Sequence, residues 1–188
     1  MGAADTREDI LRVSARLFEM HGIGGTTMRA IASGCSIKAA SLYHHFASKD
    51  EIVAEVMTQS SAFASALYAD VRDANLDPAE RVEALMRVTV QCFRAYPEAS
   101  RAFVENAEYV AAAPLLKPVR AAARVIDRQW TEAIVEGIAV GVLRDGIEPA
   151  RMWSLLREML LATSRSTTSG RVDDVLQIVM CGVFTSQR

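Results

Sequence analysis

Hydrophobic residues recur every three or four positions along most of the chain, which predicts a protein built from amphipathic helices. The first such stretch places Ile10, Val13 and Leu17 on one face, and we expect Asp5 or Thr6 to cap its start. Ala, Leu, Val, Arg and Glu are abundant and aromatic residues make up 6% of the chain, a composition that favours helices over sheets. The sequence therefore predicts an all-α fold.

The next segment predicts two short helices joined by a tight turn. Gly22 and the two glycines that follow it are expected to end the first helix, after which Thr26 or Thr27 caps the second. Gly34 permits a sharp reversal, and a third helix is expected over about residues 38–44. The expected buried anchors of this segment are Ile31, Ile37, Leu42 and Phe46.

Capping residues and prolines mark the boundaries of the remaining helices. Ser48 followed by Glu51 has the form of a capping box, which predicts a fourth helix running to about Arg72. Later boundaries are expected at Pro78, Pro97, Pro114, Pro118, Val142, Pro149 and Gly170, which gives about nine helices in all. The pattern predicts a small leading domain over residues 1–48 and a larger domain over residues 49–188.

Charge is distributed unevenly along the chain. The formal net charge is −2, yet residues 6–49 contain six Lys and Arg against three acidic residues, for a net charge of +3. All three histidines also fall in this segment. A basic module on an acidic body is able to bind phosphates locally.

Several classes of protein do not fit the sequence. No stretch has the length of a membrane span, and the N-terminus lacks a secretory signal, so we expect a cytosolic protein. The three cysteines, Cys35, Cys92 and Cys181, lie far apart and predict neither a disulfide framework nor a metal site. The signatures of a nucleophile elbow, a phosphate-binding loop and a zinc helix are missing, so neither catalysis nor a cofactor is expected.

The segment from Thr27 to Glu51 resembles the signature of the TetR family of transcriptional regulators. The run SLYHHFASK, from Ser41 to Lys49, carries most of the resemblance, which covers about the first 55 residues. Lys38 departs from the family pattern, because a Ser is usual at this position; the exchange removes a side-chain cap and adds a positive charge. The resemblance implies that residues 1–48 form a helix-turn-helix domain that binds operator DNA. It also implies that residues 49–188 form an effector-binding and dimerisation domain.

We expect the third helix to enter the major groove, since its outward residues are small or carry hydrogen-bond donors. Contacts at the front of the second helix and at the start of the fourth are expected to bind phosphates. The candidate DNA-binding residues are Thr27, Arg29, Lys38, Ala39, Ser41, Tyr43, His44 and Lys49. His45 is more readily interpreted as a packing residue.

The last two helices are strongly apolar, and the family resemblance implies that they pair with their counterparts in a homodimer. A two-fold dimer matches the symmetry of a palindromic operator. A buried core within one chain is the alternative explanation for these apolar residues.

A small-molecule effector is the second partner that the resemblance implies. Met and aromatic side chains could line its pocket, although core packing also explains each of them. The candidate ligand-binding residues are Phe63, Met86, Phe93, Phe103, Tyr109, Trp130, Arg157 and Arg165. The two arginines lie amid apolar residues and require an anionic partner, which could be Glu158, a carboxylate across the dimer or a ligand phosphate.

The motif is also similar to that of family members that govern lipid and steroid catabolism, some of which respond to acyl-CoA thioesters. We therefore expect an amphiphilic effector such as an acyl-CoA. It would release a repressor from its operator by changing the spacing of the two reading heads, which are residues 1–48 of each subunit of the dimer. The fourth helix, which joins the two predicted domains, is the expected lever. A transcriptional activator or a ligand-independent DNA-binding protein of the same fold is the alternative.

Overall fold

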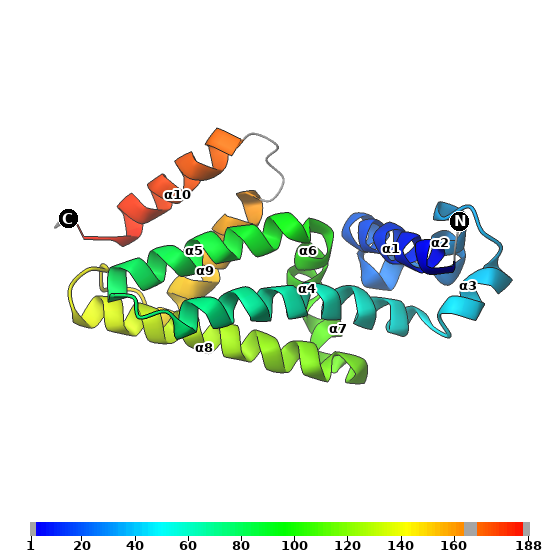
Figure 1. Ribbon diagram of the computed structural model, residues 1–188, viewed down its shortest axis with the longest axis horizontal. Helices are drawn as coiled ribbons and strands as arrows, with labels where there is room; N and C mark the ends of the chain where they lie inside the picture. The colour runs from blue at the N-terminus through cyan, green and yellow to red at the C-terminus, as the bar shows by residue number, and fades with distance from the viewer. Residues whose placement is uncertain (1–2, 164–168, 186–188) are drawn as a thin grey trace. The chain divides into compact units, whose positions relative to one another are not determined.

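The computed structural model describes residues 3–163 and 169–185, and these residues form ten α-helices, one 3-10 turn and no strand (Figure 1). The predicted all-α fold is confirmed. The helices are α1 (Ala3–Gly25), α2 (Met28–Gly34), α3 (Ala39–His45), α4 (Lys49–Asp73), α5 (Pro78–Ala95), α6 (Pro97–Glu105), α7 (Ala107–Ala112), α8 (Lys117–Ala139), α9 (Pro149–Thr163) and α10 (Ser169–Val183), with the 3-10 turn η1 (Pro114–Leu116) before α8.

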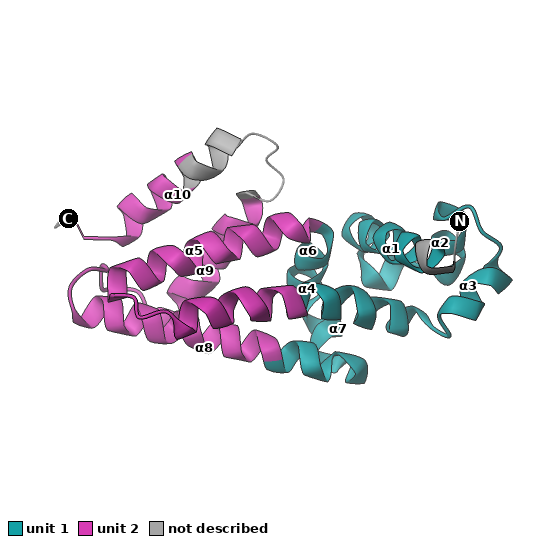
Figure 2. Cartoon of the chain, viewed as in Figure 1, with its two compact units in different colours: residues 1–61, 98–121 teal, residues 62–97, 122–188 magenta. Residues whose placement is uncertain are grey.

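The chain divides into two compact units, shown in different colours in Figure 2. Unit 1 comprises residues 1–61 and 98–121, and unit 2 comprises residues 62–97 and 122–188. Helices α4 and α8 each contribute residues to both units. Unit 1 thus contains α6 and α7 in addition to the predicted reading head. The assignment of function to residues 1–48 and 49–188 stays a prediction.

The prediction of about nine helices misses a break at Asn106. The backbone of this residue is not helical, with φ −113° and ψ 40°, and it separates α6 from α7. Its side-chain amide donates to the carbonyl of Ala102 at 2.9 Å and accepts from the backbone N–H of Ile23 at 3.1 Å. These bonds hold the corner in place, and the partner residue Ile23 is 83 positions away, so the local pattern gives no sign of it.

The first helix differs from the prediction at both ends. Its backbone is helical from Ala3, so Asp5 and Thr6 lie inside α1 and do not cap it. The helix bends at Gly22, where φ is 71° and ψ is 163°, and a further helical turn follows as far as Gly25. Gly22 provides the left-handed backbone that ends the straight part of α1.

Gly34 does not produce the reversal between α2 and α3. The positive φ of this turn belongs to Ser36, at 55°. Gly34 instead allows α2 to approach α1, because a Cβ at this position would lie 2.8 Å from Cγ1 of Val13. A positive φ is uncommon for residues other than glycine, and here the N–H of Ser36 donates to the carbonyl of Ser33 at 3.0 Å, which holds the turn.

Two later boundaries also differ from the pattern. Helix α8 ends at Ala139, three residues before the expected end at Val142, and the N–H groups of Val142 and Leu143 both donate to the carbonyl of Gly137. Gly170, which was expected to end the helix that begins at Pro149, is itself helical and lies in the first turn of α10. The helix starts at Pro78 and Pro149 are confirmed.

The core of unit 2 is apolar and closely packed. Trp130 of α8 is fully buried and stacks on Trp153 of α9, with ring centroids 4.5 Å apart and an interplanar angle of 11°. The indole N–H of Trp130 donates to the hydroxyl of Tyr68 at 3.0 Å, and this hydroxyl also lies 2.5 Å from the hydroxyl of Thr89. The buried polar atoms therefore satisfy one another. Among the described residues, no helix combines the length and the hydropathy needed to cross a membrane.

Candidate nucleic-acid interface

Helices α2 and α3 form a helix-turn-helix within unit 1. Thr27 caps α2, with its hydroxyl accepting from the backbone N–H of Ala30 at 3.1 Å. After the turn, the N–H of Ile37 donates to the carbonyl of Ala32 at 3.0 Å. The structure describes α3 in full, and Leu42 is its one buried residue. Helix α3 is therefore anchored by a single side chain and leaves most of its surface accessible.

The predicted anchors are buried with one exception. Ile31, Leu42 and Phe46 are 2% exposed or less, so the prediction is confirmed for these three residues. Ile37 is half-buried, because it lies in the turn before α3 and is covered on one side.

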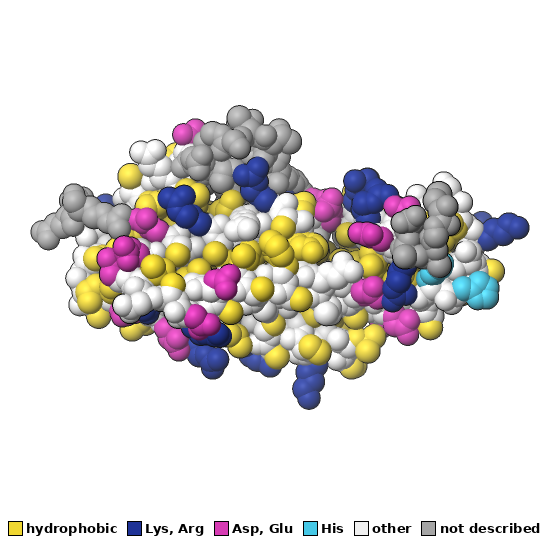
Figure 3. Space-filling model, in the orientation of Figure 1, with side chains coloured by type: hydrophobic (Ala, Val, Ile, Leu, Met, Phe, Trp, Pro, Cys, Tyr) yellow, Lys and Arg dark blue, Asp and Glu magenta, His cyan; other side chains and the backbone are white. Residues whose placement is uncertain are grey.

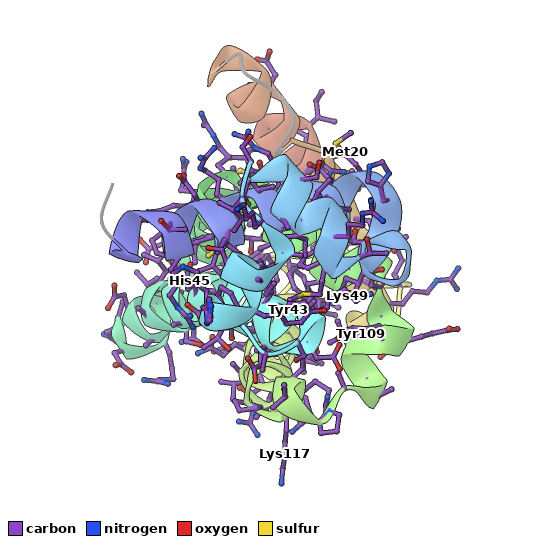
Figure 4. The ribbon with its side chains drawn as sticks, turned by 90° about the vertical axis from the view of Figure 1, so that its right-hand side faces the viewer. Met20, Tyr43, His45, Lys49, Tyr109 and Lys117 are labelled. Carbon is purple, nitrogen blue, oxygen red and sulfur yellow. The ribbon has the colours of Figure 1, made fainter. Side chains whose placement is uncertain are left out.

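The predicted DNA-binding residues gather on unit 1, and those on α3 point away from its core. Tyr43 is 55% exposed, His44 is exposed and Ser41 is half-buried (Figure 4 shows Tyr43 and Lys49 at this end of the unit). Lys38 and Ala39 are also exposed at the start of α3, as are Thr27 and Arg29 at the start of α2. Small and donor-bearing side chains thus form one outward surface, and histidine side chains lie at the same end in Figure 3. Their contact with DNA stays a prediction.

Lys38 occupies the N-cap position of α3 and provides no side-chain cap. Its backbone is extended, with φ −71° and ψ 145°, and the N–H groups of Ser41 and Leu42 donate to its carbonyl. The first N–H groups of α3 consequently lack the side-chain acceptor that Ser would offer, which leaves them available to an external anion.

Lys49 is engaged inside the protein. Its ammonium donates to the carbonyl of Ile23 at 2.6 Å and to the carbonyl of Thr26 at 2.9 Å. These carbonyls belong to the end of α1 and to the turn before α2, so Lys49 ties the start of α4 to the connection that leads into the helix-turn-helix. A phosphate contact by Lys49 stays a prediction, and such a contact would compete with these two bonds.

Arg7 was not among the predicted site residues, yet it contacts the end of α3. Its guanidinium donates from Nη1 to the carbonyl of His45 at 2.8 Å and from Nε to Oε1 of Glu55 at 3.1 Å. The partners lie 38 and 48 positions away, so no local signal in the sequence marks this residue.

Helices α6 and α7 add further polar contacts within unit 1. The guanidinium of Arg101 pairs with Glu19 at 2.9 Å, and the hydroxyl of Tyr109 donates to Asp50 at 2.6 Å. Burial raises the pKa of Tyr109, and the hydrogen bond and negative charge of Asp50 raise it further. Tyr109 is labelled beside Lys49 in Figure 4.

The predicted ligand-binding residues are distributed over both units. Unit 2 contains Phe63, Met86, Phe93, Trp130 and Arg157, and unit 1 contains Phe103 and Tyr109. Met86 and Trp130 are fully buried core residues, and Phe63 packs against Tyr96 with ring centroids 5.5 Å apart. Arg165 lies outside the described residues. A role for these side chains in binding a ligand stays a prediction.

Arg157 has an anionic partner that the sequence did not indicate. Nη1 of Arg157 lies 3.7 Å from Oδ1 of Asp127 on α8, which also accepts the indole N–H of Trp153 at 2.7 Å. The guanidinium carbon is 5.8 Å from the centroid of the Trp153 ring, while Nε is buried without a hydrogen-bond partner among the described residues. In this structure the carboxylate that pairs with Arg157 is thus Asp127, which was not among the three predicted alternatives of Glu158, a carboxylate across the dimer and a ligand phosphate.

Comparison with known proteins agrees with this geometry. The model of the tetR family of bacterial regulatory proteins matches residues 10–56. The transcriptional repressor KstR2 of Mycobacterium tuberculosis is 27% identical over 152 residues, which cover 81% of this chain and 76% of the repressor. KstR2 of Mycolicibacterium smegmatis is 24% identical over 191 residues, covering 98% of this chain and 93% of that protein.

Solved structures extend the likeness to nearly the whole chain. The ketosteroid transcriptional regulator KstR2 of Mycobacterium tuberculosis superposes with a TM-score of 0.82 and 25% identity, covering 96% of this chain and 95% of that one. AibR in complex with isovaleryl coenzyme A and operator DNA has the same fold, with a TM-score of 0.75, 21% identity, and coverage of 95% and 98%. Together with the helix-turn-helix of α2 and α3, these findings support a transcriptional regulator of the TetR family, with residues 10–56 matching the family model.

Proposed function

We propose that the protein is a ligand-responsive transcriptional repressor, which acts in the cytosol and binds a palindromic operator as a homodimer. The effector that releases it is an acyl-CoA or another amphiphile. The observation that carries DNA binding is α3, a seven-residue helix with one buried side chain and an outward surface of small and donor-bearing residues. A major groove accepts such a helix, and its base edges are read by donors of this kind.

Operator binding is tested by selecting duplexes from a randomised pool with the wild-type protein, followed by footprinting. We expect a selected sequence with two half-sites related by two-fold symmetry and separated by about one helical turn of DNA. Failure to enrich any sequence would contradict the proposal.

The homodimer is supported by an exposed apolar surface on the last two helices. Leu155 and Met159 of α9 are 45% and 47% exposed, and Ile178 of α10 is 68% exposed. Leu155 and Met159 are four residues apart and thus on one face of α9, and exposed apolar residues that gather on one face are typical of an interface. Arg144 N donates to Val183 O at 2.9 Å, which fixes the end of α10 to the loop before α9.

Sedimentation of Ile178→Asp tests this interface. We expect the variant to be monomeric and to lose operator affinity, because a charge would be buried without a partner. Val140→Asp is the matched control, since Val140 is 58% exposed but lies after α8, outside α9 and α10. A dimeric Ile178→Asp would place the interface elsewhere.

The acyl-CoA proposal rests on similarity and on charge. AibR, which shares the fold, is described in complex with isovaleryl coenzyme A, and the KstR2 relative is described as a ketosteroid regulator. In this chain the half-buried guanidinium of Arg157 lies beside the Trp153 ring, and among the described residues only Asp127 pairs with its charge, so it is a candidate donor to a phosphate oxygen. Arg165, on the same predicted face, would provide the second cation.

Titration calorimetry with a panel of acyl-CoA thioesters tests the effector. We expect binding that is weakened by Arg157→Ala and by Arg165→Ala, while Arg151→Ala, an exposed arginine of the same helix α9, leaves it unchanged. Absence of binding, or binding that ignores both substitutions, would remove this effector. If none of the thioesters changes the affinity for the operator, a ligand-independent regulator would be favoured.

Helix α4 is the proposed lever of release, because it contributes to both units and begins at the helix-turn-helix. Effector binding would favour a dimer whose reading heads no longer match successive major grooves. Saturating effector should then weaken operator affinity while sedimentation still reports a dimer. Dissociation into monomers would contradict this mechanism.

A further inference from the structure

Arg7, in the second turn of α1, contacts α3, the residue that follows α3, and α4. Nη1 donates to the carbonyl of His45, the last residue of α3, at 2.8 Å. Nε and Nη2 both donate to the carboxylate of Glu55 on α4, a two-pronged ion pair. The guanidinium carbon lies 4.1 Å from the centre of the Phe46 ring, in the residue that follows α3.

Helix α3 has few other restraints. It buries Leu42 alone among its seven described residues, and its N-cap residue, Lys38, makes no side-chain hydrogen bond. The last carbonyls of a helix lack partners within the helix, and a cation close to them is favourable because it complements the helix dipole. Arg7 meets both needs at the carbonyl of His45. Arg7 thus joins the end of α3 to α1 and α4, in addition to the buried anchors Leu42 and Phe46.

The same contacts make Arg7 a poor phosphate ligand. Three of its nitrogen atoms are engaged with protein acceptors, one face of its planar group lies on Phe46, and its charge is balanced by Glu55. By contrast Arg12, further along α1, pairs with Asp9 at 2.5 Å on the surface and makes no described contact with α3. Both arginines lie on α1, but only Arg7 has a described contact with the end of α3.

We propose that Arg7 is a positioning residue for operator recognition, which fixes the end of α3 between α1 and α4 and so allows the outward residues of α3 to distinguish the operator from other DNA. This inference rests on the proposed operator binding. It assigns to Arg7 a role in specificity that does not involve contact with the duplex.

The test compares Arg7→Gln, Glu55→Gln and the control Arg12→Gln by fluorescence anisotropy over a series of salt concentrations. The probes are the duplex that the wild-type protein selects from a randomised pool and a scrambled duplex of the same composition. Each variant is first confirmed as folded by circular dichroism and is measured well below its unfolding temperature.

For Arg7→Gln we expect affinity for the selected duplex to fall by about tenfold or more, with an unchanged salt slope and little change for the scrambled duplex. Arg12→Gln should resemble the wild type. Glu55→Gln best distinguishes a positioning role of Arg7 from a purely electrostatic one. It removes a negative charge, which by itself would strengthen DNA binding, whereas loss of the Arg7 contact should reduce affinity for the selected duplex. The double variant should lose no more than Arg7→Gln alone, since both remove the same contact.

Equal weakening on both duplexes, with a salt slope reduced by about 0.9, would identify Arg7 as a phosphate contact and overturn the proposal. Tighter binding by Glu55→Gln would overturn it as well. If Arg7→Gln does not fold, Arg7→Lys and Glu55→Gln replace it in the test. The inference is refuted if both variants distinguish the selected duplex from the scrambled one as well as the wild-type protein does. Failure of the wild-type protein to select any duplex would instead refute the proposed function.

Discussion

Each compact unit has an apolar core, and the two units differ in the polar contacts that accompany it. In unit 1, charged and amide side chains bond to the backbone of distant segments: Arg7 to His45, Lys49 to Ile23 and Thr26, and Asn106 to Ile23. In unit 2, long helices bury apolar faces, and helix α5 alone contributes seven buried residues. In the core of unit 2, the hydroxyl of Tyr68 bonds to the hydroxyl of Thr89 and accepts the indole N–H of Trp130.

The difference follows from what each unit must expose. Helices α2 and α3 have seven residues each and bury two residues and one residue respectively, so most of their side chains stay outside the core. Such helices gain little from hydrophobic burial and depend on polar contacts, each of which contributes about 1 kcal/mol. The geometry of unit 1 is therefore more easily altered by single substitutions, and the stability of unit 2 is more strongly reduced by loss of volume.

The largest effect is expected for Trp130→Ala in unit 2. Removal of this fully buried indole leaves a cavity and deprives the Tyr68 hydroxyl of a donor, so the free energy of unfolding should fall by about 3–5 kcal/mol. Denaturant unfolding measures the loss. Trp130→Phe, which keeps a ring against Trp153, should cost less. A loss below about 1 kcal/mol for the alanine variant would mean that the two units do not differ in this way.

Lys49→Met should have a smaller effect on stability, and it tests the polar contacts of unit 1. The carbonyls of Ile23 and Thr26 would lose their donor, which should lower the free energy of unfolding by about 1–3 kcal/mol. Lys38→Met is the matched control, because Lys38 is exposed and makes no side-chain cap. It should leave stability unchanged and reduce the salt slope of operator binding by about 0.9. If Lys49→Met is as stable as the wild type and shows the reduced salt slope, Lys49 is a phosphate contact.

Gly34→Ala should destabilise unit 1 by a net amount of about 1 kcal/mol. The new methyl group would lie 2.8 Å from Cγ1 of Val13, and this overpacking exceeds the gain of about 0.5–1 kcal/mol from replacing a helical glycine. The second substitution Val13→Ala should restore part of the loss, which thermal unfolding of the single and double variants would show. Additive losses in the double variant would exclude this contact as the cause.

Thiol labelling provides the smallest and least invasive comparison. Burial raises the pKa of Cys92 in unit 2 to about 11, and burial also raises the pKa of the partly exposed Cys35 in unit 1. Since the thiolate is the reactive form, Cys92 should react with iodoacetamide more slowly than the partly exposed Cys35. Mass spectrometry of the time course measures the order. Early labelling of Cys92 would show that the core of unit 2 opens readily.

Local patterns in the sequence were sufficient for the helical class, for most helix starts and for the DNA-binding motif. The spacing of Ile31, Leu42 and Phe46, the cap at Thr27 and the prolines at positions 78 and 149 act within a few residues, so their physical effect is visible in the sequence itself. The run from Ser41 to Lys49 indicated the family by its resemblance to the family signature.

Tertiary structure alone decided which polar side chains hold these helices in place. The partners of Arg7, Asn106 and Arg157 were not predicted, because each contact joins residues that chain folding brings together from distant positions. The same holds for Gly34, whose role depends on the nearness of Val13 and not on its own backbone angles. Periodicity and capping record forces between neighbours along the chain, whereas charge pairing and close packing depend on neighbours in space, and these neighbours are determined only once the whole chain has folded.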